Sequence, residues 1–270
     1  MGIKLEDLNK MVPEGYDVLV NPLQRNLDVH LQSVVKLIDY DEKGVNVTYA
    51  QKSDSGLKTV TEHADVVLCT VPLGVLKTSI GNARKPSAIK FQPPLPIWKR
   101  RAISNLGFGS LNKVACVAVS RGELFLFFAD GISPMITGLL AGEAASVGDK
   151  NRDDYLVSKA MSILRSIFGA ACPREPLSHI ITQWHLDPYA LGCYSYVSTQ
   201  STSADYDTLA RPVAPPTATA AHEPNPVLFF AGEHTHRQNT ASVAGAFLSG
   251  LRAAAEIADT LLGPFSTDGK

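Results

Sequence analysis

Apolar and polar residues alternate near the N-terminus in a way that indicates β-structure. Residues 27–31 alternate between apolar and polar side chains, which predicts a strand. Residues 34–40 and 45–49 form two further apolar-rich runs. The stretch 41–44 between them is polar and ends in glycine, so the two runs are predicted to form a β-hairpin.

Two blocks of mainly apolar residues predict strands in the core. Residues 64–71 favour a strand buried on both faces, halted by Pro72, with a turn over residues 72–74. Residues 227–230 form a second, shorter block. This block leads into a turn of small residues that carries one acid, Glu233.

The spacing of apolar residues becomes helical near the C-terminus. Between residues 241 and 262 they recur every three to four positions, and Gly263 and Pro264 then end the helix. The recurring positions are Val243, Phe247, Leu248, Leu251, Ala255, Ile257, Ala258 and Leu261.

The predicted helix begins with small side chains, which are Ala241, Ser242, Ala244, Gly245 and Ala246. A helix start of this kind offers unpaired N–H groups and a partial positive charge to an anionic or electron-rich ligand. Glu233 would then suit a ribose or ribityl hydroxyl. A close-packed helix beside an incidental acid is the alternative, and this stretch alone favours neither.

Helical and extended patterns both occur in the middle of the chain, so the fold class is α/β (α+β). Prolines hold residues 91–96 extended, and a short helix is predicted over residues 97–106. A second helix is predicted from Asp153 to Gly169. Further strands are predicted over residues 114–119, 120–127, 135–140 and 179–185, and an irregular Pro- and Ala-rich loop over residues 211–226.

Composition and charge narrow the class of protein. The chain has 270 residues, of which 45% are apolar and 19% charged, as in an ordinary globular protein. Its net charge of −1 gives no electrostatic signal for DNA binding, and no apolar run is long enough to predict a membrane span. The four cysteines lie far apart without metal-ligand spacing, which favours reduced thiols.

Three motifs resemble segments of the FAD-dependent amine oxidases, and within them the flavin-dependent lysine-specific histone demethylases. Residues 229–235 read Phe-Phe-Ala-Gly-Glu-His-Thr, and residues 69–76 read Cys-Thr-Val-Pro-Leu-Gly-Val-Leu. Residues 91–114 run from Phe-Gln-Pro-Pro-Leu-Pro to Gly-Phe-Gly-Ser-Leu-Asn-Lys-Val. The likeness spans nearly the whole chain, but it corresponds only to the C-terminal half of a family catalytic domain.

The resemblance implies a partial FAD-dependent amine oxidase fold. Residues 1–76 would form part of the FAD-binding domain, and residues 77–210 a substrate-binding domain with a mixed sheet. Residues 211–270 would return to the FAD-binding domain. Family members have a further segment near residue 120, and its shortening here would alter the surroundings of Lys113.

The resemblance also implies roles for single residues. Lys113 matches the catalytic lysine that holds a water near the flavin, Tyr194 matches a tyrosine perpendicular to the ring, and Trp184 helps wall the pocket. Ala241 and Ser242 stand where monoamine oxidases place a second tyrosine, so the pocket would admit a lysine on a peptide. The positions implied to contact FAD are Val35, Thr70, Val71, Pro72, Tyr189, Glu233, Ser242 and Val243.

Cys193 precedes Tyr194 and matches the position at which monoamine oxidases attach FAD covalently, whereas the demethylases carry serine there and bind FAD noncovalently. A buried, unreactive thiol is the simpler interpretation. Both alternatives stay open at the level of sequence.

The reaction implied by the resemblance is oxidative demethylation of mono- or dimethyl-lysine in histone tails, with release of formaldehyde and hydrogen peroxide. A methylated histone tail would be the substrate, corepressor proteins the partners, and the nucleus the location. Two alternatives remain. The chain carries no G-x-G-x-x-G motif after a strand, so it could be an inactive fragment that does not hold FAD. It could also derive from a polyamine oxidase.

Overall fold

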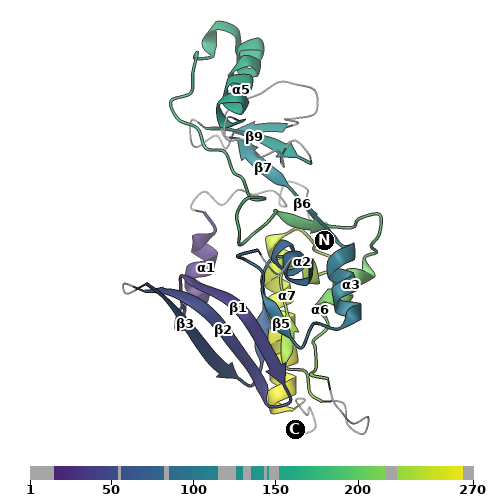
Figure 1. The fold of residues 1–270 in the computed structure, drawn as a ribbon. Helices are drawn as coiled ribbons and strands as arrows, with labels where there is room; N and C mark the ends of the chain where they lie inside the picture. Colours follow the sequence, from purple (N-terminus) through teal and green to yellow (C-terminus); the bar gives the residue numbers. More distant parts are fainter. Residues whose placement is uncertain are drawn as a thin grey trace, which may run out of the picture.

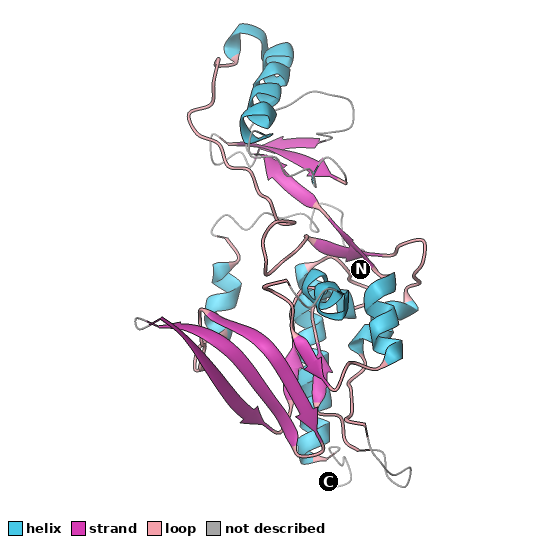
Figure 2. Cartoon of the chain, viewed as in Figure 1, coloured by secondary structure: helices cyan, strands magenta, loops and turns pink. Residues whose placement is uncertain are grey.

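The computed structural model describes residues 15–53, 56–81, 85–114, 126–129, 135–142, 145, 152–216 and 224–263. Figure 1 shows a larger body that contains the long sheet and most helices, and a smaller body that contains β7, β9 and α5. The β6 region and its neighbouring loops join the two. In Figure 2 the long strands lie on one side of the larger body and most of its helices on the other.

Four strands form the largest sheet in the order β3-β2-β1-β5. Their bounds are Ser33–Asp41 for β1, Gly44–Ser53 for β2, Gly56–Ala64 for β3 and Lys90–Gln92 for β5. Asp41 pairs with Gly44 across a two-residue turn, which confirms the predicted hairpin. Gly44 has φ +127°, and an added Cβ would lie 2.5 Å from the carbonyl oxygen of Ala64, so only glycine fits there.

The segment before β1 differs from its prediction. Residues 27–31 form a loop and not a strand, because they pair with no other strand and their apolar side chains point into solvent, with Leu31 77% exposed. Helix α1 (Asp17–Leu23) precedes this loop and also buries no side chain. The strand β3, in contrast, has a mostly polar and exposed sequence that predicts no strand.

Two short parallel strands lie at the centre of the larger body. β4 (Val67–Cys69) pairs with β11 (Leu228–Phe230), and all three residues of β11 are buried. The prediction of a strand buried on both faces over residues 64–71 was too long, because β4 has three residues and Leu68 is 36% exposed.

The predicted turn after Pro72 was also wrong, because helix α2 (Leu73–Gly81) begins there. Proline suits a helix start, where its missing N–H has no partner to lose. The carbonyl of Pro72 accepts from the amide of Val75 at 2.9 Å, which closes the first turn.

Helices α3 (Ile97–Asn105) and α6 (Ala204–Ala210) pack against the central strands. The predicted helix over residues 97–106 is therefore confirmed to within one residue. The core of the larger body draws on β1, β4, α2, α3, α6 and β11. The fully buried side chain of Lys99 packs beside this core, over the ring of Phe230.

The smaller body has a sheet of its own in the order β7-β9-β8. Its strands are β7 (Leu111–Val114), β8 (Leu126–Ala129) and β9 (Ile136–Ala141), and α5 (Arg152–Phe168) packs on it. Gly169, at φ +56°, ends α5 as predicted, and the 3-10 turn η2 (Gly169–Ala171) follows. Asp153 lies inside the first turn of α5 and does not cap it. Most of the strands predicted over residues 114–119 and 120–127, including the connection near residue 120, lie outside the described residues.

The strand predicted over residues 179–185 was wrong. A single bridge forms at Ile181, and residues 184–186 turn. Next to this bridge, the Thr182 amide donates to the carbonyl of Lys113 on β7 at 2.9 Å. The two cores of the molecule are separate, and the predicted domain limits at residues 76 and 210 stay predictions.

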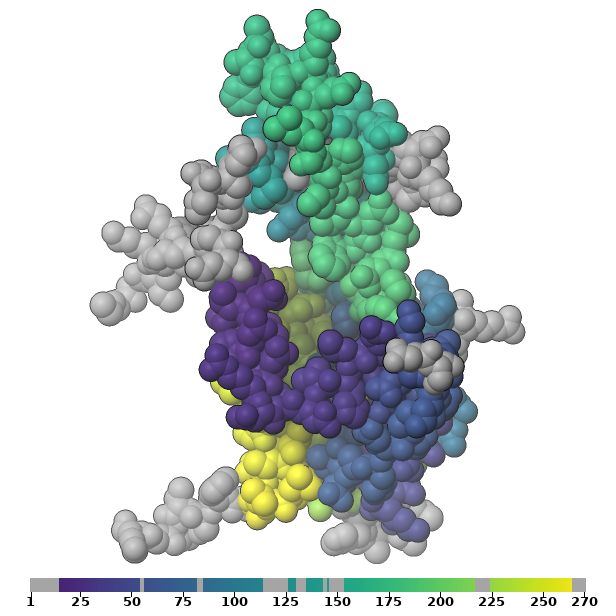
Figure 3. All heavy atoms as spheres, turned by 90° about the vertical axis from the view of Figure 1, so that its left-hand side faces the viewer, coloured from purple at the N-terminus to yellow at the C-terminus, as the bar shows by residue number. Residues whose placement is uncertain are grey.

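Helix α7 (Val243–Leu262) packs through its small side chains. Gly245, Ser249 and Ala253 are buried, whereas Val243, Phe247, Leu248 and Leu251 of the apolar stripe are 40–55% exposed. At Gly245 an added Cβ would lie 1.9 Å from the carbonyl oxygen of Asn239, so the approach at this position requires glycine. Figure 3 shows the surface of α7, in yellow, open to one side of the molecule.

Candidate functional site

The N-terminus of α7 presents unpaired backbone N–H groups that can donate hydrogen bonds. The hydroxyl of Ser242 accepts from the Gly245 amide at 3.0 Å, and the carbonyl of Ser242 accepts from the Ala246 amide at 3.1 Å. Ser242 is therefore the N-cap, which leaves the amides of Val243 and Ala244 without an intrahelical acceptor. Both residues are exposed, so a ligand can reach the backbone.

The turn before α7 is fixed onto that helix by hydrogen bonds. Gly232, at φ +129°, donates its amide to the hydroxyl of Ser249 at 2.8 Å. Arg252 donates from Nη2 to the carbonyl of Phe230 at 2.7 Å and to Oγ1 of Thr235 at 3.2 Å. These contacts place the 3-10 turn η3 (Glu233–Thr235) at the carboxyl end of β11.

The carboxylate of Glu233 accepts three hydrogen bonds from two distant segments. Oε1 accepts from the Ser195 amide at 3.0 Å, and Oε2 accepts from the Ser195 hydroxyl at 2.7 Å and from the Ala241 amide at 2.8 Å. Ser195 is 1% exposed. Glu233 thus joins Tyr194's strand to the start of α7. Sequence reasoning missed Ser195, for which the only signal is a small polar residue between two tyrosines.

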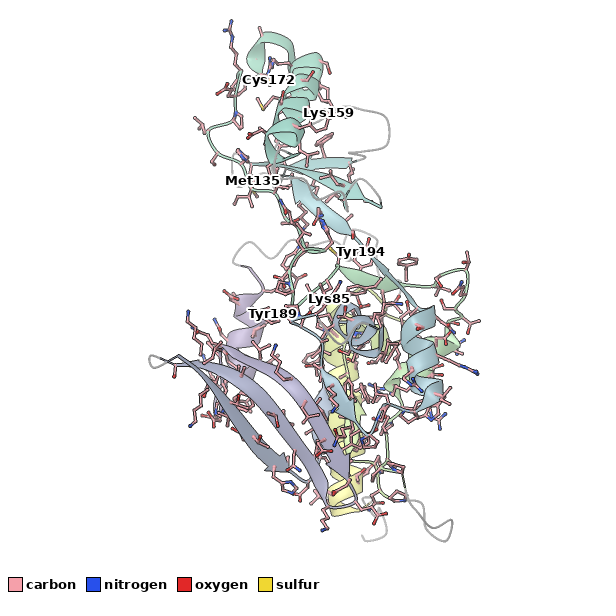
Figure 4. All side chains as sticks on the ribbon, in the orientation of Figure 1. Lys85, Met135, Lys159, Cys172, Tyr189 and Tyr194 are labelled. Carbon is pink, nitrogen blue, oxygen red and sulfur yellow. The ribbon has the colours of Figure 1, made fainter. Side chains whose placement is uncertain are left out.

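Tyr194 and Tyr196 lie on β10 (Tyr194–Tyr196), which pairs with β6 (Gly107–Gly109). Gly107 has no room for a Cβ, which would lie 2.3 Å from the ring of Tyr196. Tyr194 and Tyr196 point to the same face of the short sheet, and Ser195 points to the other. Figure 4 places Tyr194 and Tyr189 at the junction of the two bodies.

Three consecutive residues of β7 bind the segment that carries Trp184. Leu111 contacts Cys193, Asn112 contacts residues 182–185, and Lys113 exchanges hydrogen bonds with Thr182. The Lys113 side chain itself is exposed. Lys113 and Trp184 are therefore brought to one place, and Cys193 leads from there into Tyr194.

Asn112 is the centre of this arrangement and was not singled out by sequence reasoning. It is 4% exposed, and its Oδ1 accepts from the Trp184 amide at 3.1 Å and from the Thr182 hydroxyl at 3.3 Å. Its Nδ2 donates to the carbonyl of Ala145 at 2.7 Å. Trp184 is 46% exposed and Tyr189 58% exposed, so both rings present surface to a ligand.

The thiol of Cys193 is occupied by backbone groups. Its Sγ donates to the carbonyl of Leu111 at 2.7 Å and accepts from the Leu111 amide at 3.3 Å. Burial raises the pKa of this thiol, so less of it is present as the reactive thiolate.

The predicted FAD contacts in the first third of the chain lie on two elements. Val35 is half-buried on β1, beside a register shift that re-aims the strand. Thr70, Val71 and Pro72 follow β4. Because β4 and β11 are parallel, Thr70 lies at the same sheet edge as the turn that carries Glu233, and the Ala231 amide donates to the carbonyl of Cys69 at 3.2 Å.

The sequence matches the family described as "Flavin containing amine oxidoreductase" over residues 3–117 and 120–258. The chain belongs to this family. The family as a whole is characterised by a flavin cofactor and oxidoreductase chemistry. Among the described residues, no helix is long and apolar enough to cross a membrane, and no cluster of His, Cys, Asp or Glu is placed to bind a metal.

Individual relatives of this chain are histone demethylases by name. The Drosophila melanogaster "Possible lysine-specific histone demethylase 1" is 43% identical over 273 residues, which cover 93% of this chain and 30% of the relative. The Aspergillus fumigatus "Histone demethylase-like protein A" is 34% identical, with 98% of this chain and 26% of the relative covered. The chain thus spans about a third or less of these relatives, and the resemblance to histone demethylases is confirmed.

The fold of the chain is similar to that of a solved putrescine oxidase variant redesigned in cofactor binding. The TM-score is 0.63 at 17% identity, and the match covers 87% of this chain and 50% of that chain. At this identity the likeness shows the fold alone, and it confirms the partial amine oxidase fold.

The described residues fit one part of a flavin site. The Val243 and Ala244 amides supply donors beside exposed side chains, and the exposed Thr70 lies at the sheet edge of Glu233. Such a set suits the carbonyl and nitrogen acceptors of a planar, electron-rich ring together with the hydroxyls of its sugar-like chain.

Proposed function

We propose that the protein is an FAD-dependent amine oxidase that demethylates mono- and dimethylated lysine in histone tails and releases formaldehyde and hydrogen peroxide. The observation that carries this proposal is identity of 34–43% to histone demethylases over more than nine-tenths of the chain. Because the chain spans only part of those relatives, the substrate and partners belong to the proposal.

The proposed roles of single residues come from the family resemblance. Lys113, exposed on β7, would hold a water and move a proton, while Tyr194 and Trp184 would form aromatic walls for a methylated amine. The residues that would hold FAD are Val35, Thr70, Val71, Pro72, Tyr189, Glu233, Ser242 and Val243.

When bound, the flavin supplies hydride acceptance from the N-methyl carbon and reoxidation by O2. The residues of the chain would orient the amine and keep it deprotonated. Ala241 and Ser242 would leave only small side chains beside the ring, so the pocket would be wide enough for a lysine on a peptide. Methylated histone tails are nuclear, so a nuclear location with corepressor partners is part of the same proposal.

A flavin-retention assay on the purified chain tests the cofactor. After FAD is added and unbound FAD is removed, we expect a yellow protein that absorbs at about 450 nm. Peroxide release should then follow with a dimethyl-lysine peptide and not with spermine. A colourless protein that retains no FAD would contradict the proposal in favour of an inactive fragment, and a preference for spermine would indicate a polyamine oxidase.

A further inference from the structure

Ser195 and Glu233 lie 38 residues apart in sequence, yet two hydrogen bonds join them. The serine gives both its amide and its hydroxyl to one carboxylate. The serine side chain is buried at 1% exposure, so water does not compete for the hydroxyl.

The same carboxylate also holds Ala241. This alanine has φ +57°, a left-handed conformation that is unfavourable for a residue with a Cβ. Its amide donates to Oε2 of Glu233 at 2.8 Å, and Ser242, the N-cap of α7, follows directly. The carboxylate therefore fixes the backbone that aims the first amides of α7.

The other end of the contact fixes Tyr194. β10 is three residues long and pairs only with the equally short β6 within the described structure. Because side chains alternate along a strand, anchoring Ser195 on one face sets the direction of Tyr194 on the other.

We infer that Ser195 is a positioning residue that acts through Glu233. The clamp of Ser195, Glu233 and Ala241 couples the orientation of Tyr194 to the donor amides at the start of α7. This inference rests on the proposed function, in which Tyr194 and those amides serve one flavin. Glu233 then has a task inside the protein besides any contact with the cofactor.

Amide hydrogen exchange on the full chain tests the clamp without any cofactor. In Ser195→Ala the amides of segments 194–197 and 238–246 should both exchange about tenfold faster, because the hydroxyl bond to Glu233 is lost. A tenfold change corresponds to about 1.4 kcal/mol. Ser203→Ala is the matched control, because Ser203 makes no side-chain cap for α6. Faster exchange at residues 194–197 alone would overturn the coupling.

A second measurement separates positioning from simple stabilisation. Ser195→Ala should weaken FAD binding about tenfold while the melting temperature falls by only about 2 to 4 °C, and Ser195→Thr, which restores the hydroxyl, should recover both. Glu233→Gln should give the same coupled exchange as Ser195→Ala. If the wild-type chain binds no FAD, the proposed function fails, but the hydrogen-exchange comparison still tests the clamp because it needs no cofactor. If it binds FAD and Ser195→Ala exchanges like wild type, the clamp alone is wrong.

Discussion

Lys99 donates from Nζ to the carbonyl oxygen of Leu209 at 2.8 Å, although the two residues belong to different helices and both are fully buried. The same nitrogen lies 3.8 Å from the centroid of the Phe230 ring and also donates to the carbonyl of Arg211. Burial holds the pKa of Lys99 well below its usual range, while the carbonyls at the end of α6 and the aromatic face favour a cation there. Lys99 therefore ties α3, α6 and β11 together.

Replacing Lys99 with methionine should lower the free energy of unfolding by about 2 kcal/mol, because the buried carbonyls at the end of α6 lose their donor. Urea denaturation measures this change. Lys77→Met is the control, since Lys77 donates only to the Ser104 carbonyl at a half-buried site and should cost less than about 1 kcal/mol. Equal stability of Lys99→Met and wild type would show that Lys99 does not stabilise the packing of α3, α6 and β11.

His234 should make the protein sensitive to mild acid. Burial, and secondarily the charge of Lys99, lower its pKa from 6.5 to about 4. As pH falls, the unfolded chain takes up this proton first. The contribution of His234 to stability is therefore complete above about pH 6.5, falls as pH drops toward about 4, and is constant below, a loss of about 3 kcal/mol.

Denaturation at about pH 7.5 and about pH 4.5 tests this dependence. His234→Gln should lose much of the difference between the two conditions. His63→Gln, at an exposed site on β3, should keep it. An acid dependence that is unchanged in His234→Gln would assign the effect to other groups.

The fold elements that sequence predicts well here are those set by local pattern. The hairpin around Asp41 and Gly44 needs only a turn and its flanking runs, and α3 and α7 need only helical spacing and a stop. Elements set by partners elsewhere were missed. β3 is polar because its side chains are exposed, and only its pairing with β2 makes it a strand. Residues 27–31 have the alternation of a strand but no partner.

The candidate site shows the same difference between residues that local sequence reveals and residues that depend on distant partners. Glu233 stands out in sequence because it lies in a small-residue turn after a buried strand. Ser195, Asn112 and Lys99 do not, since each gains its importance from partners 30 or more residues away. Lys99 in particular has the sequence context of an ordinary helix-surface lysine, and its burial arises only from tertiary packing.

Asn112 should be intolerant of change. Asn112→Ala removes the acceptor of the Trp184 amide and the donor of the Ala145 carbonyl, so we expect a loss of about 2 to 3 kcal/mol in unfolding free energy. The emission of Trp184 should shift toward that of a solvated indole. Asn46→Ala, on the exposed face of β2, is the control. A variant with wild-type stability and emission would show that Asn112 does not hold the Trp184 segment.

Lys113→Met should separate catalysis from folding. The side chain is exposed, so the melting temperature should change by little, whereas loss of proton transfer should lower the turnover of a dimethyl-lysine peptide by about 10²-fold or more. FAD retention should stay at the wild-type level. Lys58→Met, at an exposed position on β3, should leave turnover unchanged. Turnover within about twofold of wild type in Lys113→Met would remove this lysine from the proposed mechanism.

Cys193 should not be linked to the flavin. Its Sγ is held by both backbone groups of Leu111, and burial raises the pKa of the thiol, so the thiolate needed for attack is scarce. Acid precipitation of the FAD-loaded chain should therefore leave the flavin in the supernatant. Cys193→Ser can keep both hydrogen bonds and should retain FAD equally well. Flavin that stays with the pellet in wild type and leaves it in Cys193→Ser would instead establish a thioether at this position.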